Sequence, residues 1–276
     1  MIKNIAAYHF VVVEDPDALA GVLRARAEAA DLRGTILVAG EGVNLFLAGG
    51  PDAIDGFVAA LRADARFADL IVKASESDAL PFARLKVKVK PEIISFRMPD
   101  AEPIAGRAPA VLPEALARWI AQGCDDDGRR LVLLDTRNRE EVAYGSFVDA
   151  LTLPIDNFTE LPDAVLAQRD AWTDATVVSF CTGGIRCEKA ALWMRAQGMD
   201  NVLQLDGGIL GYFEAVGGFG YDGACFVFDD RVALGPGLDP VRPPMPATMP
   251  APFPRVERAE SATGGGARSA GARIDG

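Results

Sequence analysis

Over the first hundred residues, hydrophobic positions switch between strand-like runs and a helical spacing, which indicates strands interleaved with helices. The expected strands cover 5–13, 34–50 (a pair broken by Gly40-Glu41-Gly42), 70–76 and 84–96, and the expected helices cover 16–32 and 53–67. Asp15 or Asp17 suits the start of the first helix, and Asp52 suits that of the second. The order β-α-β-β-α-β is typical of ferredoxin-like domains and predicts one over residues 1–98.

A second pattern begins after a segment rich in Pro, Ala and Gly at 99–113, which predicts a linker. Apolar runs at 130–138, 175–180 and 201–208 alternate with helical patterns at 112–123 and 187–199. Continuous apolar strands separated by helices indicate a parallel sheet that is covered on both faces. We therefore expect a second domain, of the α/β class, over residues 114–234.

The composition changes again at about Gly235. Residues 235–276 are rich in Pro, Gly and Ala and show no apolar periodicity. Such a segment cannot bury enough apolar surface to offset the entropy lost on ordering. The sequence therefore predicts a disordered tail, which is dispensable for folding beyond about Pro240.

Length and charge narrow the possible functions. The 276 residues suit two domains of ordinary size, with 50% hydrophobic and 24% charged residues. The chain lacks a run of about 18 apolar residues, and its first residues lack the pattern of a signal peptide, so we expect a cytoplasmic protein. A formal net charge of -11 argues against nonspecific coating of nucleic acid but leaves room for a local basic patch.

The cysteines favour nucleophilic or packing roles over metal binding. They stand at Cys124, Cys181, Cys187 and Cys225 without a C-x-x-C pair, and His9 is the one histidine. This spacing is not that of a zinc site, and a disulfide framework is not expected in a cytosolic chain. We therefore expect no bound metal and no bound cofactor.

Cys181 stands where an expected strand meets an expected helix, at the sheet edge where open α/β folds bind ligands. The loop that follows the strand consists of Cys181, Thr182, Gly183, Gly184, Ile185 and Arg186. Its two glycines permit the dihedral angles that turn backbone N–H groups inward, and such a nest beside a helix N-terminus favours an anion. Together with the charge of Arg186, this field is expected to lower the pKa of Cys181 and make the thiol nucleophilic.

Loop size and two further segments match rhodanese domains. A Cys-x4-Arg loop is the size that sulfur-handling rhodaneses use, whereas related cysteine phosphatases use a longer one. Asp135-Thr136-Arg137 with Glu141 resembles the rhodanese strand end, and 205–208 resembles the closing turn. For Asp135 and Arg137 we favour a buried ion pair that orders the loops over direct contact with a substrate.

The segment from Cys181 to Lys189 resembles the signature of the tRNA uridine(34) hydroxylases, as do the segments 40–44, 81–90 and 225–231. The likeness spans about residues 1–234. It implies an acylphosphatase-like (ferredoxin-like) domain followed by a rhodanese-like domain. It also implies oxygen-dependent formation of 5-hydroxyuridine at the tRNA wobble position, with Cys181 as the catalytic cysteine. Longer members carry a cysteine-rich tail, whereas this sequence has no cysteine beyond Cys225.

A basic strand supports an RNA substrate. The cations at Arg84, Lys86, Lys88 and Lys90 alternate with apolar residues, so a period of two places all four on one strand face. Such a stripe suits tRNA phosphates. The other interpretation is an edge strand that its lysines protect against aggregation.

We therefore expect a tRNA uridine hydroxylase in which Cys181 and Arg186 are catalytic, with Arg186 and the loop N–H groups holding anionic charge. It is expected to use molecular oxygen as co-substrate and to bind the anticodon loop of tRNA, without a membrane or an obligate protein partner. The main alternative is a rhodanese-type sulfurtransferase that carries a persulfide on Cys181, which the loop alone does not separate from a hydroxylase. A catalytically silent binding module is a third possibility, although such a module could dispense with the nucleophile.

Overall fold

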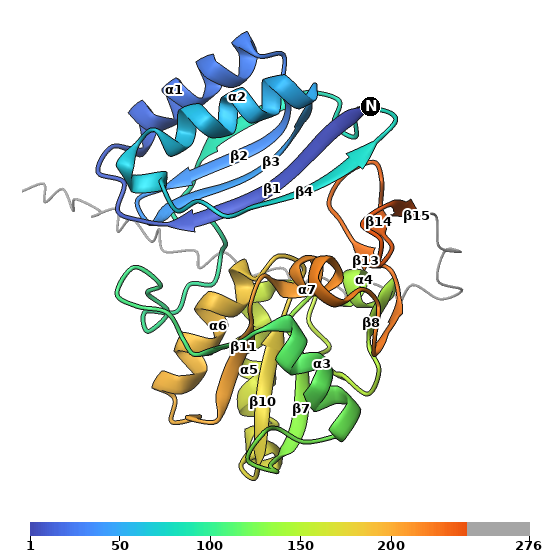
Figure 1. The fold of residues 1–276 in the computed structure, drawn as a ribbon. Helices are drawn as coiled ribbons and strands as arrows, with labels where there is room; N and C mark the ends of the chain where they lie inside the picture. The colour runs from blue at the N-terminus through green and yellow to red at the C-terminus, as the bar shows by residue number, and fades with distance from the viewer. Residues whose placement is uncertain (242–276) are drawn as a thin grey trace, which may run out of the picture.

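The computed structural model describes residues 1–241 and folds them into two α/β domains that lie one above the other (Figure 1). The N-terminal domain contains β1 (Ile2–Phe10), α1 (Pro16–Ala29), β2 (Arg33–Ala39), β3 (Gly42–Gly49), α2 (Pro51–Arg62), η1 (Ala65–Phe67), β4 (Val72–Ser77) and β5 (Leu85–Val89). Its sheet has the order β4-β1-β3-β2-β5, in which β5 is parallel to β2 and the other pairs are antiparallel. The expected ferredoxin-like fold is confirmed, with a strand added at the β2 edge.

The helix starts differ in how they are capped. The Asp15 carboxylate accepts a hydrogen bond from the N–H of Ala18 at 2.9 Å and begins α1. No side chain caps α2, which begins at Pro51 after Gly50, and Asp52 lies in its first turn. A proline at the first helical position sets the helical φ angle and needs no hydrogen-bond acceptor, which explains why this start works without a side-chain cap.

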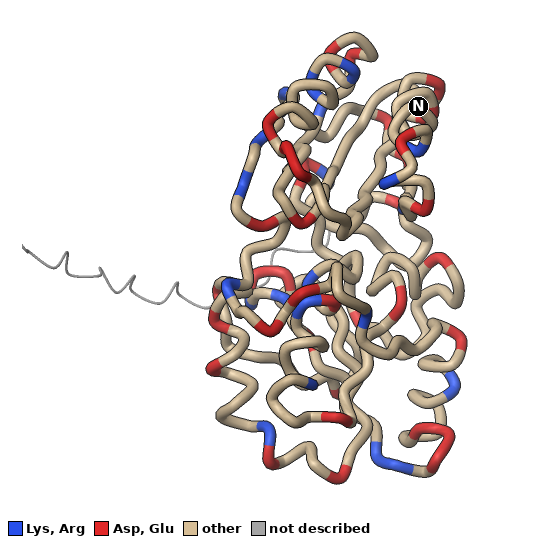
Figure 2. The backbone as a smooth tube through the Cα atoms, turned by 90° about the vertical axis from the view of Figure 1, so that its left-hand side faces the viewer, with Lys and Arg blue, Asp and Glu red and all other residues tan. Residues whose placement is uncertain are grey.

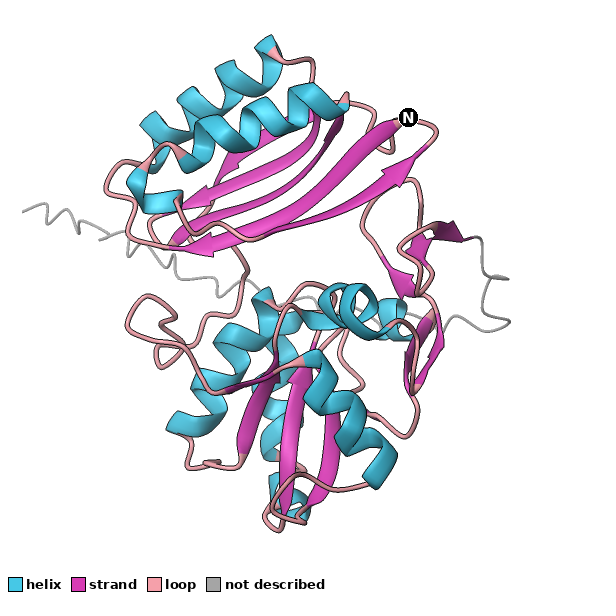
Figure 3. Cartoon of the chain, viewed as in Figure 1, coloured by secondary structure: helices cyan, strands magenta, loops and turns pink. Residues whose placement is uncertain are grey.

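The two faces of the N-terminal sheet have different partners. Both helices cover one face, as Figure 3 shows, and residues such as Ile5, Leu45 and Val87 point into the core beneath them. Because side chains alternate along a strand, residues such as Tyr8 and Phe46 point the other way. That open face is turned toward the C-terminal domain (Figure 3).

The C-terminal domain is built on a five-stranded parallel sheet with the order β6-β11-β10-β7-β9. Its elements are β6 (Ala110–Val111), α3 (Pro113–Gln122), β7 (Arg130–Asp135), α4 (Arg139–Val142), β8 (Gly145–Phe147), β9 (Leu151–Thr152), η2 (Phe158–Glu160), α5 (Leu161–Leu166), η3 (Arg169–Trp172), β10 (Ala175–Phe180), α6 (Ile185–Ala196), β11 (Val202–Leu205), α7 (Gly208–Val216), β12 (Tyr221–Gly223), β13 (Cys225–Phe226), β14 (Ala233–Leu234) and β15 (Pro240–Val241). Every residue of β10 is buried, so the expected parallel sheet covered on both faces is confirmed.

The segment 99–113, expected as a linker, is packed against the C-terminal domain. Ala101 and Ala108 are buried in its core, and β6 pairs with β11 as the outermost strand of the sheet. The side-chain amide of Gln204 also donates to the carbonyl of Ala108 at 3.0 Å. The segment is therefore anchored at Ala101, Ala108 and β6, while Ala105, Gly106 and Pro109 between them are exposed.

One buried ammonium group joins the two domains. Lys189 on α6 is 2% exposed, and its Nζ lies 2.8 Å from Glu41 of the N-terminal domain and 2.7 Å from Glu92. Beside this pair, Ile185 packs against Ala39 and Ile93. Burying a lysine costs free energy unless it is paired, so the two carboxylates must stay close to α6.

A second connection lies at the β4 edge of the upper sheet. The guanidinium of Arg231 donates to the Ser75 hydroxyl at 2.7 Å and is also paired with Asp229. The backbone N–H of Asp230 donates to the carbonyl of Pro81 at 3.1 Å. With Lys189, this contact holds the domains together at two separate places.

The expected tail begins later than its composition suggested. Within 235–241, the described residues turn back so that β15 pairs with β14, which in turn pairs with β13. Ala233 and Leu234 are buried. The prediction of a disordered tail was therefore wrong for 235–241, because one hairpin suffices to bury a few apolar side chains. Residues 242–276 lie outside the described part of the chain.

We expect that truncation after Val241 leaves the thermal unfolding midpoint within about 2 °C of the full chain, since 242–276 lacks apolar periodicity. Truncation after Val232 removes Leu234, whose burial is worth about 1.5–3 kcal/mol. That deletion is expected to lower the midpoint by roughly 3–12 °C. Calorimetry of both proteins is the measurement, and a large loss on the first truncation would contradict the boundary.

Candidate active site

Cys181 lies at the carboxyl end of β10, and the loop that follows it is fixed by the start of α7. The N–H of Ile209 donates to the carbonyl of Cys181 at 2.9 Å, and the N–H of Leu210 donates to the carbonyl of Thr182 at 3.0 Å. Because these carbonyls point toward α7, the N–H groups that follow are free to turn inward. The nest expected from the sequence thus depends on a second helix as well as on α6.

Only one of the two loop glycines needs its special conformation. Gly184 has a φ of +100°, in the region that favours glycine, whereas Gly183 does not have a positive φ. The expectation that both glycines adopt unusual dihedral angles was therefore wrong for Gly183. A third glycine is also required, since a Cβ on Gly208 would lie 2.5 Å from the carbonyl oxygen of Cys181.

The loop directs its polar hydrogens at the sulfur of Cys181. The N–H of Gly184 lies 3.2 Å from Sγ, and the N–H groups of residues 186 and 187 also bond to it. Burial by itself raises the pKa of the Cys181 thiol. The hydrogen bond from the Cys187 thiol, the charge of Arg186 and these amides outweigh burial, so the pKa falls well below its usual range. These contacts favour the thiolate, which is the reactive form of cysteine.

Cys187 behaves in the opposite way. Its thiol is also fully buried and lies 3.5 Å from the Thr136 hydroxyl. Burial and the neighbouring Cys181 raise the pKa of Cys187 well above its usual value. Within this pair, Cys187 keeps its proton and donates it toward Cys181.

Arg186 is engaged with a carboxylate and is not free to hold a ligand. Its two terminal nitrogens each donate to one oxygen of Glu141 at 2.6 Å, and both side chains are almost fully buried. Burial tends to raise the pKa of Glu141, but the charge of Arg186 and its hydrogen bonds hold that pKa below its usual range. Arg186 therefore acts on Cys181 through its charge, while Glu141 fixes the guanidinium.

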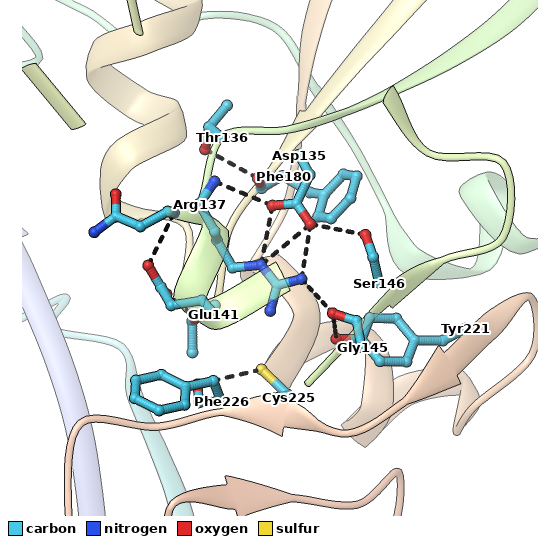
Figure 4. Close-up of polar contacts among 12 residues, drawn as sticks. Asp135, Thr136, Arg137, Glu141, Gly145, Ser146, Phe180, Tyr221, Cys225 and Phe226 are labelled. Atoms are coloured by element: carbon cyan, nitrogen blue, oxygen red, sulfur yellow. Dashed lines mark hydrogen bonds and ion pairs between the residues drawn. The ribbon is translucent and has the colours of Figure 1, made fainter. Parts of the chain in front are cut away.

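Asp135 and Arg137 form a separate buried pair, shown in Figure 4. Arg137 donates from Nε and Nη2 to the Asp135 carboxylate and from Nη2 to the carbonyl of Gly145, and Ser146 donates to the same carboxylate at 2.7 Å. Both side chains of the pair are fully buried. This is the geometry of the loop-ordering ion pair favoured from the sequence, and neither residue lines the cavity in front of Cys181.

A cavity of about 950 Å³ lies between the two domains. Its floor includes Cys181, Thr182, Gly183, Ile185 and Arg186, and its roof is the open face of the N-terminal sheet.

The sequence did not single out a polar cluster in this cavity. The hydroxyl of Tyr8 donates to Glu188 at 2.9 Å, and Arg107 bonds to the same carboxylate oxygen at 3.0 Å and to Asp206 at 2.7 Å. Burial raises the pKa of Glu188, although Arg107 opposes the shift. Glu188 lies in the hydroxylase-like signature, but its partners come from a distant strand and from the 99–113 segment, which no local pattern indicates.

The four cations of the basic strand are all exposed. Val87 packs beneath α1, so Lys86 and Lys88, its neighbours on β5, point to the open face of the sheet. Lys90 lines the cavity. Because β5 is also an edge strand, its position agrees with both interpretations of the lysines.

Other features of the described residues bear on the chemistry. All four cysteines are free. Within residues 1–241, no three His, Cys, Asp or Glu side chains are grouped as metal ligands would be, and no helix is both long and apolar enough to span a membrane. Figure 2 shows basic and acidic residues intermixed over both domains, so a positive surface, where present, is local.

We expect Glu141→Gln to destabilise the protein by about 3–5 kcal/mol at neutral pH, because it leaves the Arg186 charge buried without its partner. Since the folded-state pKa of Glu141 is lowered, its contribution is present above the ordinary pKa of a glutamate and is lost as pH falls through the folded value. Urea unfolding from pH 8 to pH 3 measures this. Glu140→Gln, at the exposed neighbouring position, is the control, and equal stability of the two variants would contradict the pairing.

Comparisons with known proteins agree with this architecture. The model of the UPF0176 acylphosphatase like domain matches residues 2–93, and that of the rhodanese-like domain matches residues 113–215. The chain is 66% identical over 241 residues to the tRNA uridine(34) hydroxylase of Xanthomonas euvesicatoria pv. vesicatoria, covering 87% of this chain and 97% of the relative. The enzyme of the same name from Xylella fastidiosa is 63% identical, covering 87% and 94%. The chain therefore belongs to the tRNA uridine(34) hydroxylase family.

Proposed function

We propose that this protein hydroxylates the uridine at position 34 of tRNA to 5-hydroxyuridine, with Cys181 as catalytic residue and molecular oxygen as co-substrate. The observation that carries the proposal is the Cys181 sulfur, held by the Gly184 N–H at 3.2 Å, in the wall of a cavity that Lys90, the residue after β5, also lines. Family membership supports the substrate and the reaction. A wobble-position reaction of this kind is expected in the cytoplasm, where tRNA is used.

The geometry suits a base that is presented without opening a duplex. Anticodon loops contain unstacked bases, which can enter a pocket at little energetic cost. The loop N–H groups and the charge of Arg186 stabilise negative charge at Cys181, and Glu141 holds Arg186 in place. Cys181, Thr182 and Gly183 line the cavity, and Cys187 supplies a proton donor to the Cys181 sulfur.

A rhodanese-type sulfurtransferase remains the second candidate, because the same N–H groups would stabilise a persulfide on Cys181. The two reactions leave different products. A hydroxylase adds oxygen to the uridine, whereas a sulfurtransferase leaves a sulfur atom on its acceptor. Nucleoside mass spectrometry of tRNA from cells with and without the protein distinguishes them.

We expect Cys181→Ser to abolish 5-hydroxyuridine formation and Cys124→Ser to leave it intact. Cys124 is the matched control because it lies in a loop outside the cavity. The measurement is 5-hydroxyuridine content of tRNA from deletion cells complemented with each variant. Full activity of the serine protein at 181 would exclude Cys181 as the catalytic residue.

We also expect replacement of Lys86, Lys88 and Lys90 together by Gln to weaken tRNA binding and to flatten its salt dependence. Each lost phosphate contact reduces the slope of log K against log salt by roughly 0.7–0.9. The matched control replaces Arg118, Arg129 and Arg130, three exposed cations outside the cavity, by Gln. Binding measured over a salt series decides the role of the strand. An unchanged slope with more aggregation would instead support an edge strand protected by its lysines.

A further inference from the structure

One row of paired residues crosses the open face of the N-terminal sheet. Strand register places Lys73 of β4 beside Ala6 of β1, Ala6 beside Phe46 of β3, Phe46 beside Thr35 of β2, and Thr35 beside Lys86 of β5. Paired residues share a face, so an aromatic ring lies at the centre of this row, with a small side chain on either side and a lysine on each edge strand.

Phe46 is the aromatic residue on this face for which the structure shows no packing partner among the described residues. It is half-buried and lines the cavity, yet within residues 1–241 it joins no hydrophobic cluster and contacts no other aromatic ring. Its neighbours differ in this respect. Tyr8 is bonded to Glu188, and Phe10 packs edge-on against Tyr8 with the Lys189 ammonium 5.9 Å from its ring centre. Ala6 and Thr35 are too small to cover the Phe46 ring.

The chemistry of the row fits one nucleotide and its neighbours. An exposed phenyl ring offers a stacking surface for a flat base, and base–aromatic stacking tolerates any base. Adjacent strands lie about 4.8 Å apart, so Lys73 and Lys86 are each roughly 10 Å from Phe46, on opposite sides. Lys86 is exposed, and Lys73 is 3.6 Å from the largely exposed Glu214, a weak pair that phosphate can replace. RNA-recognition motifs stack bases on aromatic residues of a similar four-stranded sheet.

The row also lies next to the Cys181 loop. Tyr8 follows Ala6 by two residues on the same face of β1, and its hydroxyl lies 2.9 Å from where a Cβ on Gly184 would stand. Phe46 and Cys181 line the same cavity from opposite walls. A base stacked on Phe46 is therefore enclosed between the sheet and the loop that holds the thiolate.

We propose that Phe46 is the stacking platform for an unpaired base of the tRNA anticodon loop, with Lys73 and Lys86 binding the phosphates on its two sides. The identity of the RNA rests on the proposed function, whereas the stacking site rests on the row itself.

The test measures binding of an anticodon stem-loop carrying uridine at position 34. Phe46→Ala and Phe46→Leu are expected to weaken binding roughly tenfold to hundredfold, because both remove the aromatic face, and Phe46→Tyr is expected to restore it. The salt slope should stay as in the unmodified protein, since no ionic contact is lost. Phe219→Ala, which removes a ring that is 50% exposed and outside the cavity, is the matched control and should bind normally.

A second measurement locates the contact directly. A stem-loop with 5-iodouridine in the anticodon is irradiated, and the cross-linked peptide is sequenced. A cross-link in the peptide 34–62, which contains Phe46, that disappears in Phe46→Leu supports the platform. This holds even if the protein forms no 5-hydroxyuridine, in which case only the proposed reaction fails. The opposite outcome is a wild-type protein that forms 5-hydroxyuridine and a Phe46→Leu variant that binds and cross-links as well as the wild type. That result overturns the platform and leaves the proposed reaction intact.

Discussion

The buried ammonium of Lys189 determines how far apart the two halves of the site lie. It belongs to α6, the helix that begins in the Cys181 loop, and its two carboxylate partners belong to the N-terminal domain and the segment after it. Removing either carboxylate while the domains stay in contact would leave a buried cation poorly compensated, at a cost of several kcal/mol. The cavity therefore has a fixed roof, because the same helix positions the thiolate and holds the sheet above it.

The two buried arginines of the site are each paired with one carboxylate. Arg137 is neutralised by Asp135, and Arg186 by Glu141, so neither guanidinium presents a full free charge to the cavity. What remains for Cys181 is the field of the loop N–H groups and part of the Arg186 charge. Backbone dipoles of this kind are already oriented before a substrate arrives, so they stabilise the thiolate without reorganisation. The Glu141 pair matters because it prevents Arg186 from moving to a ligand phosphate.

The features that the sequence predicted are those that local chemistry determines. The Cys181 loop was recognisable because its nucleophile, its glycines and its arginine are adjacent in the chain. The partner of Arg186 is 45 residues away, and its identity follows from the packing of α4 beneath the loop. Phe46 lies in an apolar strand, and the alternation of side chains along a strand does not say which sheet face the helices will cover. The structure shows that both helices cover the other face, so that the face of Phe46 is turned toward the C-terminal domain.

An acidic protein can bind tRNA if its cations are concentrated where the substrate must lie. The formal net charge is -11, yet β5 contributes exposed lysines to the same sheet face as Phe46. At physiological ionic strength, charges are screened over about 8 Å, so the exposed lysines of β5 act on phosphates that lie close to them, whereas the cavity itself is lined by acidic and basic side chains alike. The acidic surface meanwhile disfavours RNA bound elsewhere on the molecule. A tRNA drawn to these lysines would lie against the sheet face that, through Phe46, lines the same cavity as Cys181.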